Sequence, residues 1–170
     1  MIETVSSSDD VESVRRLMRE YRAHLAANPA GTASICLVGY ESELAGLPGP
    51  YVAPGGLWLA MVDGEAAGCV ALKKLPEAGA LELKRLELKR LWVEARFRGL
   101  GLGRRLMQAA IDHARAAGAR AIYLDTVPAA MPEANRLYAG MGFVEVERYN
   151  DNAVADIAFF RLQLDSGDYR

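Results

Sequence analysis

The chain has 170 residues, of which 51% are hydrophobic and 25% charged, and 20 Lys and Arg against 22 Asp and Glu give a formal net charge of −2. This composition is typical of a single soluble globular domain over residues 1–170 and excludes a disordered chain, collagen and a coiled coil. No apolar run reaches the roughly 18 residues of a membrane-spanning helix, and the near-neutral charge argues against a nucleic-acid partner. Because residues 1–10 lack the basic and apolar regions of a secretory signal, we expect a cytoplasmic protein with no membrane partner.

Cysteine and histidine are too scattered to form a metal site. Cys36 and Cys69 stand singly in apolar stretches, so we expect buried reduced thiols. His24 and His113 lie in predicted amphipathic helices and join no Cys or carboxylate cluster. Cys69 is considered as an acyl-carrying nucleophile, but the sequence places no histidine to activate it.

In the first half of the chain we expect a strand at residues 2–5 and a helix at 9–26. A long loop region follows at 28–56, and then a hairpin whose two strands are residues 57–62 and 66–72. The helix follows from apolar side chains at helical spacing. Within the loop region only residues 40–45 suggest a short helix. The hairpin follows from Asp63-Gly64, which supplies the positive φ values of a tight turn.

A five-residue repeat occupies residues 81–85 and 86–90, and the apolar run then ends at Val93. It predicts a long strand, but a period of five is out of phase with the strand period of two, so the apolar positions shift from odd to even and back. A β-bulge would absorb such a slip, and bulges occur often beside active sites. The alternative is a strand that is covered on both faces, where alternation carries little meaning.

The second half predicts alternating helices and strands. We expect helices at 104–117 and 132–139 and strands at 121–127, 143–149 and 153–164. A strand, a loop, a helix and a strand in this order form a right-handed crossover between two parallel strands. The predicted fold is α/β with a mixed sheet.

The segment Arg96–Arg105 carries the strongest local signal. Its three alternating glycines, 99, 101 and 103, allow successive backbone N–H groups to converge, and the following helix adds its positive dipole end. Arg104 and Arg105 lie in the first helical turn, where a cation is disfavoured by roughly 0.3–1 kcal/mol unless an anion is present. The segment therefore predicts a pyrophosphate site. A loop that needs its glycines only for a turn is the alternative.

Spacing narrows the choice of phosphate ligand. No Walker sequence is present. A dinucleotide fingerprint would place its third glycine at position 104, which is Arg104, although Asp125 falls near the expected ~20 residues downstream. A nicotinamide-dependent oxidoreductase therefore stays an alternative.

Four motifs follow one another along the chain: Leu91-Trp92-Val93, Arg98-x-x-Gly101-x-Gly103, Leu124-Asp125-Thr126 and Ala134-x-x-Leu137-Tyr138-x-x-x-Gly142-Phe143. In this order and spacing, over about residues 86–149, they resemble the GCN5-related N-acetyltransferase (GNAT) superfamily. The resemblance implies a mixed, mostly antiparallel central sheet with flanking helices and a splayed parallel pair, with one strand ending near Val93 and the other beginning near Ala121.

The resemblance also implies acetyl-CoA as acyl donor; the scattered His and Cys residues described above predict no metal. Its pyrophosphate would bind the backbone of the glycine loop and its pantetheine the strand end, through Leu91, Val93, Arg98, Gly99, Leu100, Gly101, Leu102, Gly103 and Arg104. One departure is Met131, since many relatives have Asn at this position, seven residues before the tyrosine. Asn135, on the next turn, is not assumed to replace it.

Two catalytic residues are predicted. Tyr138 is our candidate for the acid that protonates the departing thiolate, and a helix-face aromatic in the core is the alternative. By the resemblance, the Val93 N–H would face the thioester carbonyl. Glu87 is our candidate for the base that accepts the amine proton. One alternative is that Glu87 is only a solvated or salt-bridged acid beside Lys89 and Arg90, and another is that water acts as the base.

Two further groups of residues have ambiguous roles. Asp125 and Thr126 end a predicted strand, and either contact a substrate or cap a turn. Tyr149, Asn150 and Asp151 either line the acceptor side or simply form a hairpin loop between the last two strands, and the hairpin loop is favoured.

The sequence thus predicts an N-acetyltransferase that passes the acetyl group of acetyl-CoA directly to an amine, without a covalent enzyme intermediate. A small-molecule amine is favoured over a protein N-terminus or lysine as acceptor. A non-catalytic CoA-binding sensor or scaffold is the alternative from another class. Exposed strand edges keep a homodimer open.

Overall fold

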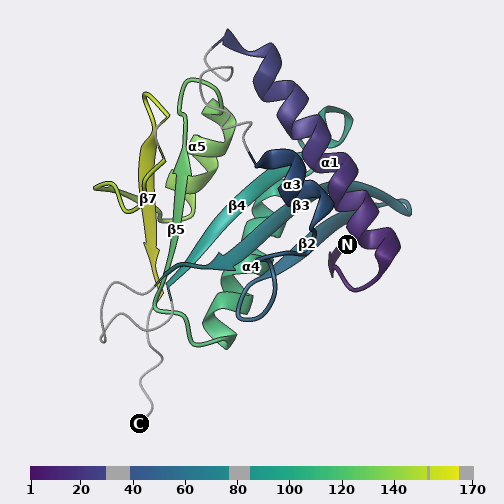
Figure 1. Cartoon of the computed structure of the whole chain (residues 1–170), viewed down its shortest axis with the longest axis horizontal. Coiled ribbons are helices and arrows are strands. Elements are labelled where there is room, and N and C mark those ends of the chain that lie inside the picture. Colours follow the sequence, from purple (N-terminus) through teal and green to yellow (C-terminus); the bar gives the residue numbers. More distant parts are fainter. Residues whose placement is uncertain (30–38, 77–84, 153, 165–170) are drawn as a thin grey trace.

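The computed structural model describes residues 1–29, 39–76, 85–152 and 154–164. One sheet of seven strands runs through the described part, in the order β1-β2-β3-β4-β5-β7-β6 (Figure 1). The strands are β1 (Ile2–Thr4), β2 (Gly56–Val62), β3 (Glu65–Lys74), β4 (Arg85–Val93), β5 (Ala121–Thr126), β6 (Val144–Val146) and β7 (Ala158–Gln163). The helices are α1 (Ser8–Ala27), α3 (Tyr40–Ala45), α4 (Leu102–Ala116) and α5 (Pro132–Gly140), with a 3₁₀ turn at Ala95–Phe97.

The mixed α/β fold expected from the sequence is confirmed, and the elements lie close to their predicted positions. All neighbouring strands are antiparallel except β4 and β5, which are parallel. The last two strands are shorter than predicted, because residues 147–152 and 154–157 do not join the ladder. No helix in the described ranges has the length and apolarity needed to cross a membrane.

Local chemistry fixes where α1 begins. The Ser7 side chain accepts a hydrogen bond from the Asp10 N–H at 3.1 Å, and the Asp10 carboxylate accepts one from the Ser7 N–H at 2.9 Å. This reciprocal pair is a capping box, which satisfies two backbone donors at the helix start. The buried face of α1, including Val14, Leu17 and Met18, then packs on the sheet.

The sheet is covered on both faces. On one face α1 and α3 pack against residues such as Cys69 and Ala71 of β3, while on the other face α4 packs against Val70 and Leu72. Successive β3 side chains thus enter opposite apolar clusters, as the strand period of two requires. The central strands are therefore held rigidly from both sides.

The predicted β-bulge is confirmed in β4. Cys69 pairs with Trp92, but Ala71 pairs with Lys89, so β4 has one more residue than β3 over this stretch. Arg90 has a φ of 58°, which places it in the left-handed region at the bulge. The first half of the repeat, residues 81–84, lies outside the described residues.

The predicted splay of the parallel strands is also observed. β4 and β5 pair at Arg85 with Ala121, Leu86 with Ile122 and Glu87 with Tyr123. Beyond these pairs β4 stays on β3 as far as Val93, whereas β5 stays on β7 as far as Thr126. The sheet therefore opens between the two strands, next to the bulge.

Candidate active site

A cavity of about 640 Å³, which we call the loop cavity, lies between the end of β4, the glycine loop and α5. Of the predicted cofactor-binding residues, the structure brings all but Leu100 into its wall: Leu91, Val93, Arg98, Gly99, Gly101, Leu102, Gly103 and Arg104. Leu100 points outward and is 56% exposed.

The glycine loop needs glycine for backbone reasons. Gly99 and Gly101 have φ values of 83° and 71°, and Gly101 is the N-cap of α4. A Cβ on Gly103 would lie 3.3 Å from Cδ2 of Leu137, so the loop approaches α5 closely. These features bring backbone donors together at the helix N-terminus, where an anion is stabilised.

The cations beside the loop are available for an anion. Arg104 and Arg105 are exposed in the first turn of α4 and have no acidic partner among the described residues. The Nε of Arg98 donates to the Val93 carbonyl at 3.2 Å, and the guanidinium lies 4.9 Å from the centroid of the Trp92 ring. The loop therefore fits the diphosphate of a coenzyme.

A second cavity of about 580 Å³, which we call the strand cavity, occupies the opening between β4 and β5. Its wall is formed by parts of α1, α3, β4, the end of β5, α5 and the loop before β7. Leu91 and Met131 line both cavities, so the two cavities adjoin at these side chains.

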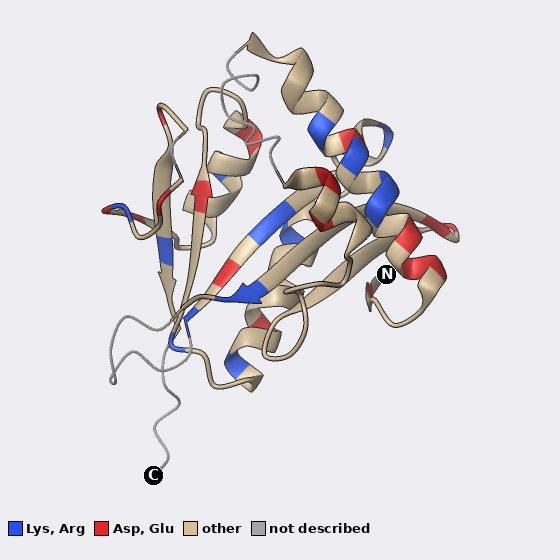
Figure 2. Cartoon of the chain, viewed as in Figure 1, with Lys and Arg blue, Asp and Glu red and all other residues tan. Residues whose placement is uncertain are grey.

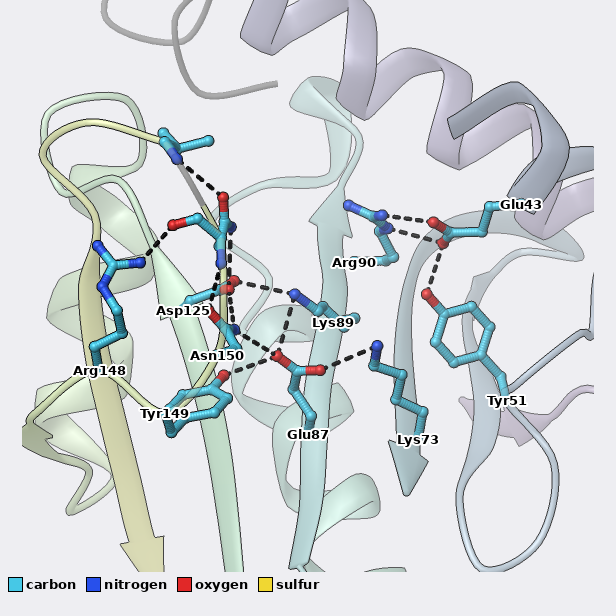
Figure 3. Close-up of polar contacts among 12 residues, drawn as sticks. Glu43, Tyr51, Lys73, Glu87, Lys89, Arg90, Asp125, Arg148, Tyr149 and Asn150 are labelled. Atoms are coloured by element: carbon cyan, nitrogen blue, oxygen red, sulfur yellow. Dashed lines mark hydrogen bonds and ion pairs between the residues drawn. The ribbon is translucent and has the colours of Figure 1, made fainter. Parts of the chain in front are cut away.

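A polar network lies beside the strand cavity (Figure 3). The buried carboxylate of Glu87 accepts a hydrogen bond from the Tyr149 hydroxyl at 2.8 Å and lies 3.2 Å from the ammonium groups of both Lys73 and Lys89. Lys89 also lies 3.1 Å from Asp125. Burial alone raises the pKa of Asp125, but the Lys89 charge and hydrogen bonds from Asn150 and Asn152 outweigh it and lower the pKa.

The bulge residue Arg90 joins a separate group of contacts (Figure 3). Its Nε and Nη2 donate to the two oxygens of Glu43 at 2.9 and 2.6 Å, and the Tyr51 hydroxyl donates to Glu43 at 2.6 Å. The guanidinium also lies 4.7 Å from the centroid of the Tyr40 ring. Burial lowers the pKa of Arg90, but the Glu43 hydrogen bonds reverse this effect and raise it, so Arg90 stays charged.

Comparison with known proteins agrees with this geometry. The sequence model of the acetyltransferase (GNAT) family matches residues 19–143. The chain belongs to the GNAT family. An uncharacterized N-acetyltransferase of Schizosaccharomyces pombe is 30% identical over 165 residues, which cover 96% of this chain and 94% of that protein. Human N-acetylaspartate synthetase is 31% identical over 105 residues, which are 61% of this chain but 33% of the synthetase.

Solved GNAT structures share the fold. An acetyltransferase of the GNAT family from Staphylococcus aureus superposes with a TM-score of 0.73 at 19% sequence identity. The matched residues cover 97% of this chain and 100% of that protein's chain. YncA from Salmonella typhimurium, whose structure contains its cofactor acetyl-CoA, superposes with a TM-score of 0.72 at 18% sequence identity. The matched residues cover 99% of this chain and 95% of the YncA chain. Members of the GNAT family use acetyl-CoA, and the loop cavity described above fits this ligand.

The position of Tyr138 agrees with both roles considered from the sequence. Its ring is buried, with centroids 6.0 Å from Phe143 and 6.5 Å from Phe160, as a core aromatic would be. The residue also lines the strand cavity, and its hydroxyl has no hydrogen-bond partner within the described ranges. Burial raises the pKa of Tyr138, so the phenol keeps its proton at neutral pH.

Glu87 lies in the buried polar network beside the strand cavity. It is 2% exposed, and in the described part of the chain it belongs to the wall of neither cavity. Both oxygens are engaged, one by Tyr149 and Lys89 and the other by Lys73. This geometry agrees with the alternative of a salt-bridged strand acid and does not favour direct contact with an acceptor.

The other candidates have structural surroundings. His24 lines the loop cavity 5.0 Å from the Trp92 ring, and His113 Nε2 lies 3.0 Å from the Pro54 carbonyl. Burial raises the pKa of Cys69 to about 12, so its thiol is a poor nucleophile, and Cys36 lies outside the described residues. Within the described ranges, no three His, Cys, Asp or Glu side chains gather as metal ligands would.

Several residues in and beside the strand cavity were not assigned a role from the sequence. Tyr149 and Asn150 were expected to form a plain hairpin loop, but both reach Glu87 and Asn150 also reaches Asp125. Arg22 and Tyr40 line the cavity from α1 and α3. No local pattern marks these residues, because only the packing of distant elements brings them to the opening between the strands.

Proposed function

We propose that this protein transfers the acetyl group of acetyl-CoA directly to the amine of a small molecule bound in the strand cavity. The observation that carries this proposal is that two cavities adjoin at Leu91 and Met131, beside the opening between β4 and β5. A volume of about 580 Å³ falls in the range of small-molecule sites. Relatives such as human N-acetylaspartate synthetase are named for a small-molecule product.

The donor side is proposed to be held mainly by backbone. The N–H groups of residues 98–104 and the N-terminus of α4 would bind the diphosphate, and Leu91 and Val93 the pantetheine. When bound, acetyl-CoA supplies an acetyl group activated as a thioester. Met131, at the position where the family resemblance would place an Asn, adds an apolar side chain to the wall of both cavities.

The Val93 N–H is oriented for a role at the thioester carbonyl. The Glu94 N–H donates to the Ala67 carbonyl at 2.9 Å, so residue 94 directs its hydrogen bond toward β3. In an antiparallel pair, adjacent residues direct their N–H groups to opposite sides. Val93, which pairs with Gly68, therefore directs its N–H toward the open side of β4. There it can stabilise negative charge that develops on the carbonyl oxygen.

Tyr138 is proposed as the proton donor to the departing thiolate. The residue lines the strand cavity, its hydroxyl makes no hydrogen bond among the described residues, and the phenol stays protonated because burial raises its pKa. A raised pKa makes a phenol reluctant to lose its proton completely. The proposal is therefore that Tyr138 donates a hydrogen bond that strengthens as charge builds on the sulfur, with proton transfer following.

For the acceptor proton we propose water in the strand cavity as the base. Glu87 would then be a positioning residue, because its carboxylate fixes Lys89 and, through Lys89, Asp125. The prediction that Glu87 is itself the base is tested by a substitution described in the Discussion.

A binding experiment and a turnover experiment test the proposed function. Thermal unfolding measured with CoA, acetyl-CoA, NAD and NADP should show stabilisation by the first two alone. Release of free thiol from acetyl-CoA should then require an added amine from a panel of small amines. Stabilisation by CoA without transfer to any amine would favour the non-catalytic CoA-binding alternative. Stabilisation by NAD or NADP instead would favour the oxidoreductase.

Two broader expectations from the sequence stay predictions. We infer a cytoplasmic location, which fractionation of the native host would test. A homodimer formed through exposed strand edges is tested by light scattering of the purified protein.

A further inference from the structure

Three basic side chains line the strand cavity among the described residues: Arg22 of α1 and Lys89 and Arg90 of β4. Figure 2 shows the basic stretches of α1 and β4 that contribute them. The guanidinium carbons of Arg22 and Arg90 lie 5.8 and 4.7 Å from the centroid of the Tyr40 ring. Both guanidinium groups therefore lie against the ring of Tyr40, which also lines the strand cavity.

Each of these cations has hydrogen-bond donors to spare. Arg90 uses Nε and Nη2 on Glu43, and Arg22 uses Nη1 on Glu41. Lys89 contacts two carboxylates, those of Glu87 and Asp125, but an ammonium group has three N–H donors. For the remaining donors of Arg22 the described ranges contain no partner, and the remaining polar neighbour of Arg90 is the Tyr51 hydroxyl.

The acids that neutralise these cations lie mostly behind them. Within the described part of the chain, Glu41, Glu43 and Glu87 do not belong to the wall of the strand cavity. Asp125 and Asp151 do line it. The Asp125 oxygens already accept from Lys89, Asn150 and Asn152, and Asp151 is exposed. The wall beside Arg22 and Arg90 therefore presents donors to a ligand.

We propose that the acceptor is an amine that carries a carboxylate close to its nitrogen, as an α- or β-amino acid does, and that Arg22 and Arg90 bind this carboxylate. The inference rests on the proposed function and specifies its acceptor. Guanidinium groups match the geometry of a carboxylate with paired hydrogen bonds. The same wall repels polyamines and other polycationic acceptors.

The position of Arg90 suits this assignment. Arg90 directly precedes Leu91, the residue at which the two cavities adjoin. A carboxylate on Arg90 would therefore lie one residue along β4 from the junction of the two cavities. In the reaction the N–C bond of the amide forms, the C–S bond of the thioester breaks, and one proton passes from the amine to the released thiolate. An amine that arrives protonated first loses one further proton to water.

The test compares matched acceptors in the thiol-release assay. The panel contains the standard L-amino acids and β-alanine. For the amino acid with the highest activity it also contains the methyl ester and the decarboxylated amine. Spermidine, an aminoglycoside and a short peptide with a free N-terminus represent other acceptor classes. We expect the best amino acid to exceed its own methyl ester at least about tenfold in kcat/KM, because the ester lacks the charged partner of the arginines.

Arg22→Gln provides the variant, and Arg19→Gln is its matched control. Arg19 lies on the same helix, pairs with Glu12 at 3.5 Å and is absent from the described cavity wall. We expect Arg22→Gln to raise the KM for the amino acid about tenfold with little change in kcat, and to leave the preference over the ester much reduced. Arg19→Gln should leave both constants unchanged.

The outcomes separate this inference from the proposed function. If spermidine, the peptide or the methyl ester is used as well as the amino acid, or if Arg22→Gln affects the ester equally, the inference is overturned while acetyl transfer stands. If no amine releases thiol from acetyl-CoA, the proposed function fails. Calorimetric titration of the protein with each amino acid in the presence of CoA then tests whether Arg22 and Arg90 form a carboxylate site. Binding that Arg22→Gln weakens would support a carboxylate site, and no binding would overturn it.

Discussion

The Nζ of Lys89 lies 3.1 Å from Oδ1 of Asp125 and links β4 to β5 just beyond their last backbone pair, Glu87 with Tyr123. The ion pair thus connects the two strands where the backbone hydrogen bonds have ended. Burial disfavours both charges, yet the pKa of Lys89 is raised by Glu87 and Asp125, and the pKa of Asp125 is lowered. The opening between the strands is therefore held in a defined shape.

Asp125→Asn should destabilise the protein by about 1–3 kcal/mol at pH 7, because Lys89 loses one charged partner. The folded pKa of Asp125 lies below its unfolded value of about 3.9. The stabilisation is therefore fully present above that value and is lost as the pH falls through the folded pKa. Urea unfolding from pH 7 to pH 3 should show the difference from wild type shrinking. Asp112→Asn, at a 62% exposed side chain, should have little effect at any pH, and a pH-independent difference for Asp125→Asn would contradict the assignment.

Glu87→Gln distinguishes a positioning role from a base. If Glu87 positions Lys89, the free energy of unfolding should fall by more than about 1 kcal/mol, while the pH–rate profile keeps its shape. If Glu87 is the base, kcat should fall about 10²–10⁴-fold and the acidic limb of the profile should disappear. Glu145→Gln, at an exposed position of β6, is the control for loss of one negative charge.

Tyr138→Phe should lower kcat about 10²-fold or more, since the hydroxyl is the proposed donor to sulfur. The Kd for CoA and the Tm should hardly change, because the ring packing is kept and the hydroxyl makes no hydrogen bond within the described ranges. Tyr149→Phe provides the contrast, since its hydroxyl donates to Glu87 at 2.8 Å and its loss should cost about 1 kcal/mol of stability. Unchanged turnover in Tyr138→Phe would rule out the proposed role.

Gly101→Ala tests the glycine loop against backbone strain alone. Gly101 and Gly64 have φ values of 71° and 81°, and neither position shows a described atom within 4 Å of an added Cβ. Both alanine variants should lose roughly 1–2 kcal/mol of stability. Gly101→Ala alone should also raise the Kd for CoA, by at least about tenfold. Equal CoA affinity of the two variants, measured by calorimetry, would remove the loop from the binding site.

Arg104→Gln should change stability and affinity in opposite directions. A cation in the first turn of α4 is unfavourable, so the unbound variant should gain about 0.3–1 kcal/mol. Its affinity for CoA should fall, and the loss should diminish at high salt. Arg115→Gln, in the last turn of the same helix, should show the reverse effect on stability and none on CoA. A loss of stability in Arg104→Gln would show that the arginine has a structural role in the unbound protein.

The sequence by itself determined the features that depend on local backbone chemistry. The glycine loop requires positive φ at residues 99 and 101, and the helix behind it follows from apolar spacing. The five-residue repeat predicted a bulge because side chains in a strand must alternate. The register shift lies between Lys89 and Trp92, where the apolar positions change from even to odd numbers. In each case the cause lies within a few residues of the effect.

Only the tertiary structure decided what the strand cavity contains. The pattern of β4 marks Glu87, Lys89 and Arg90 as polar, but it does not say which partner each one meets. Folding brings Tyr149 onto Glu87 beside that cavity and places both Arg22 and Arg90 of its wall against the ring of Tyr40. Hydrophobic burial determines which faces of distant helices, strands and loops pack together. The polar side chains at the edges of those faces are brought together as a result, so the partner of each charge depends on the tertiary packing.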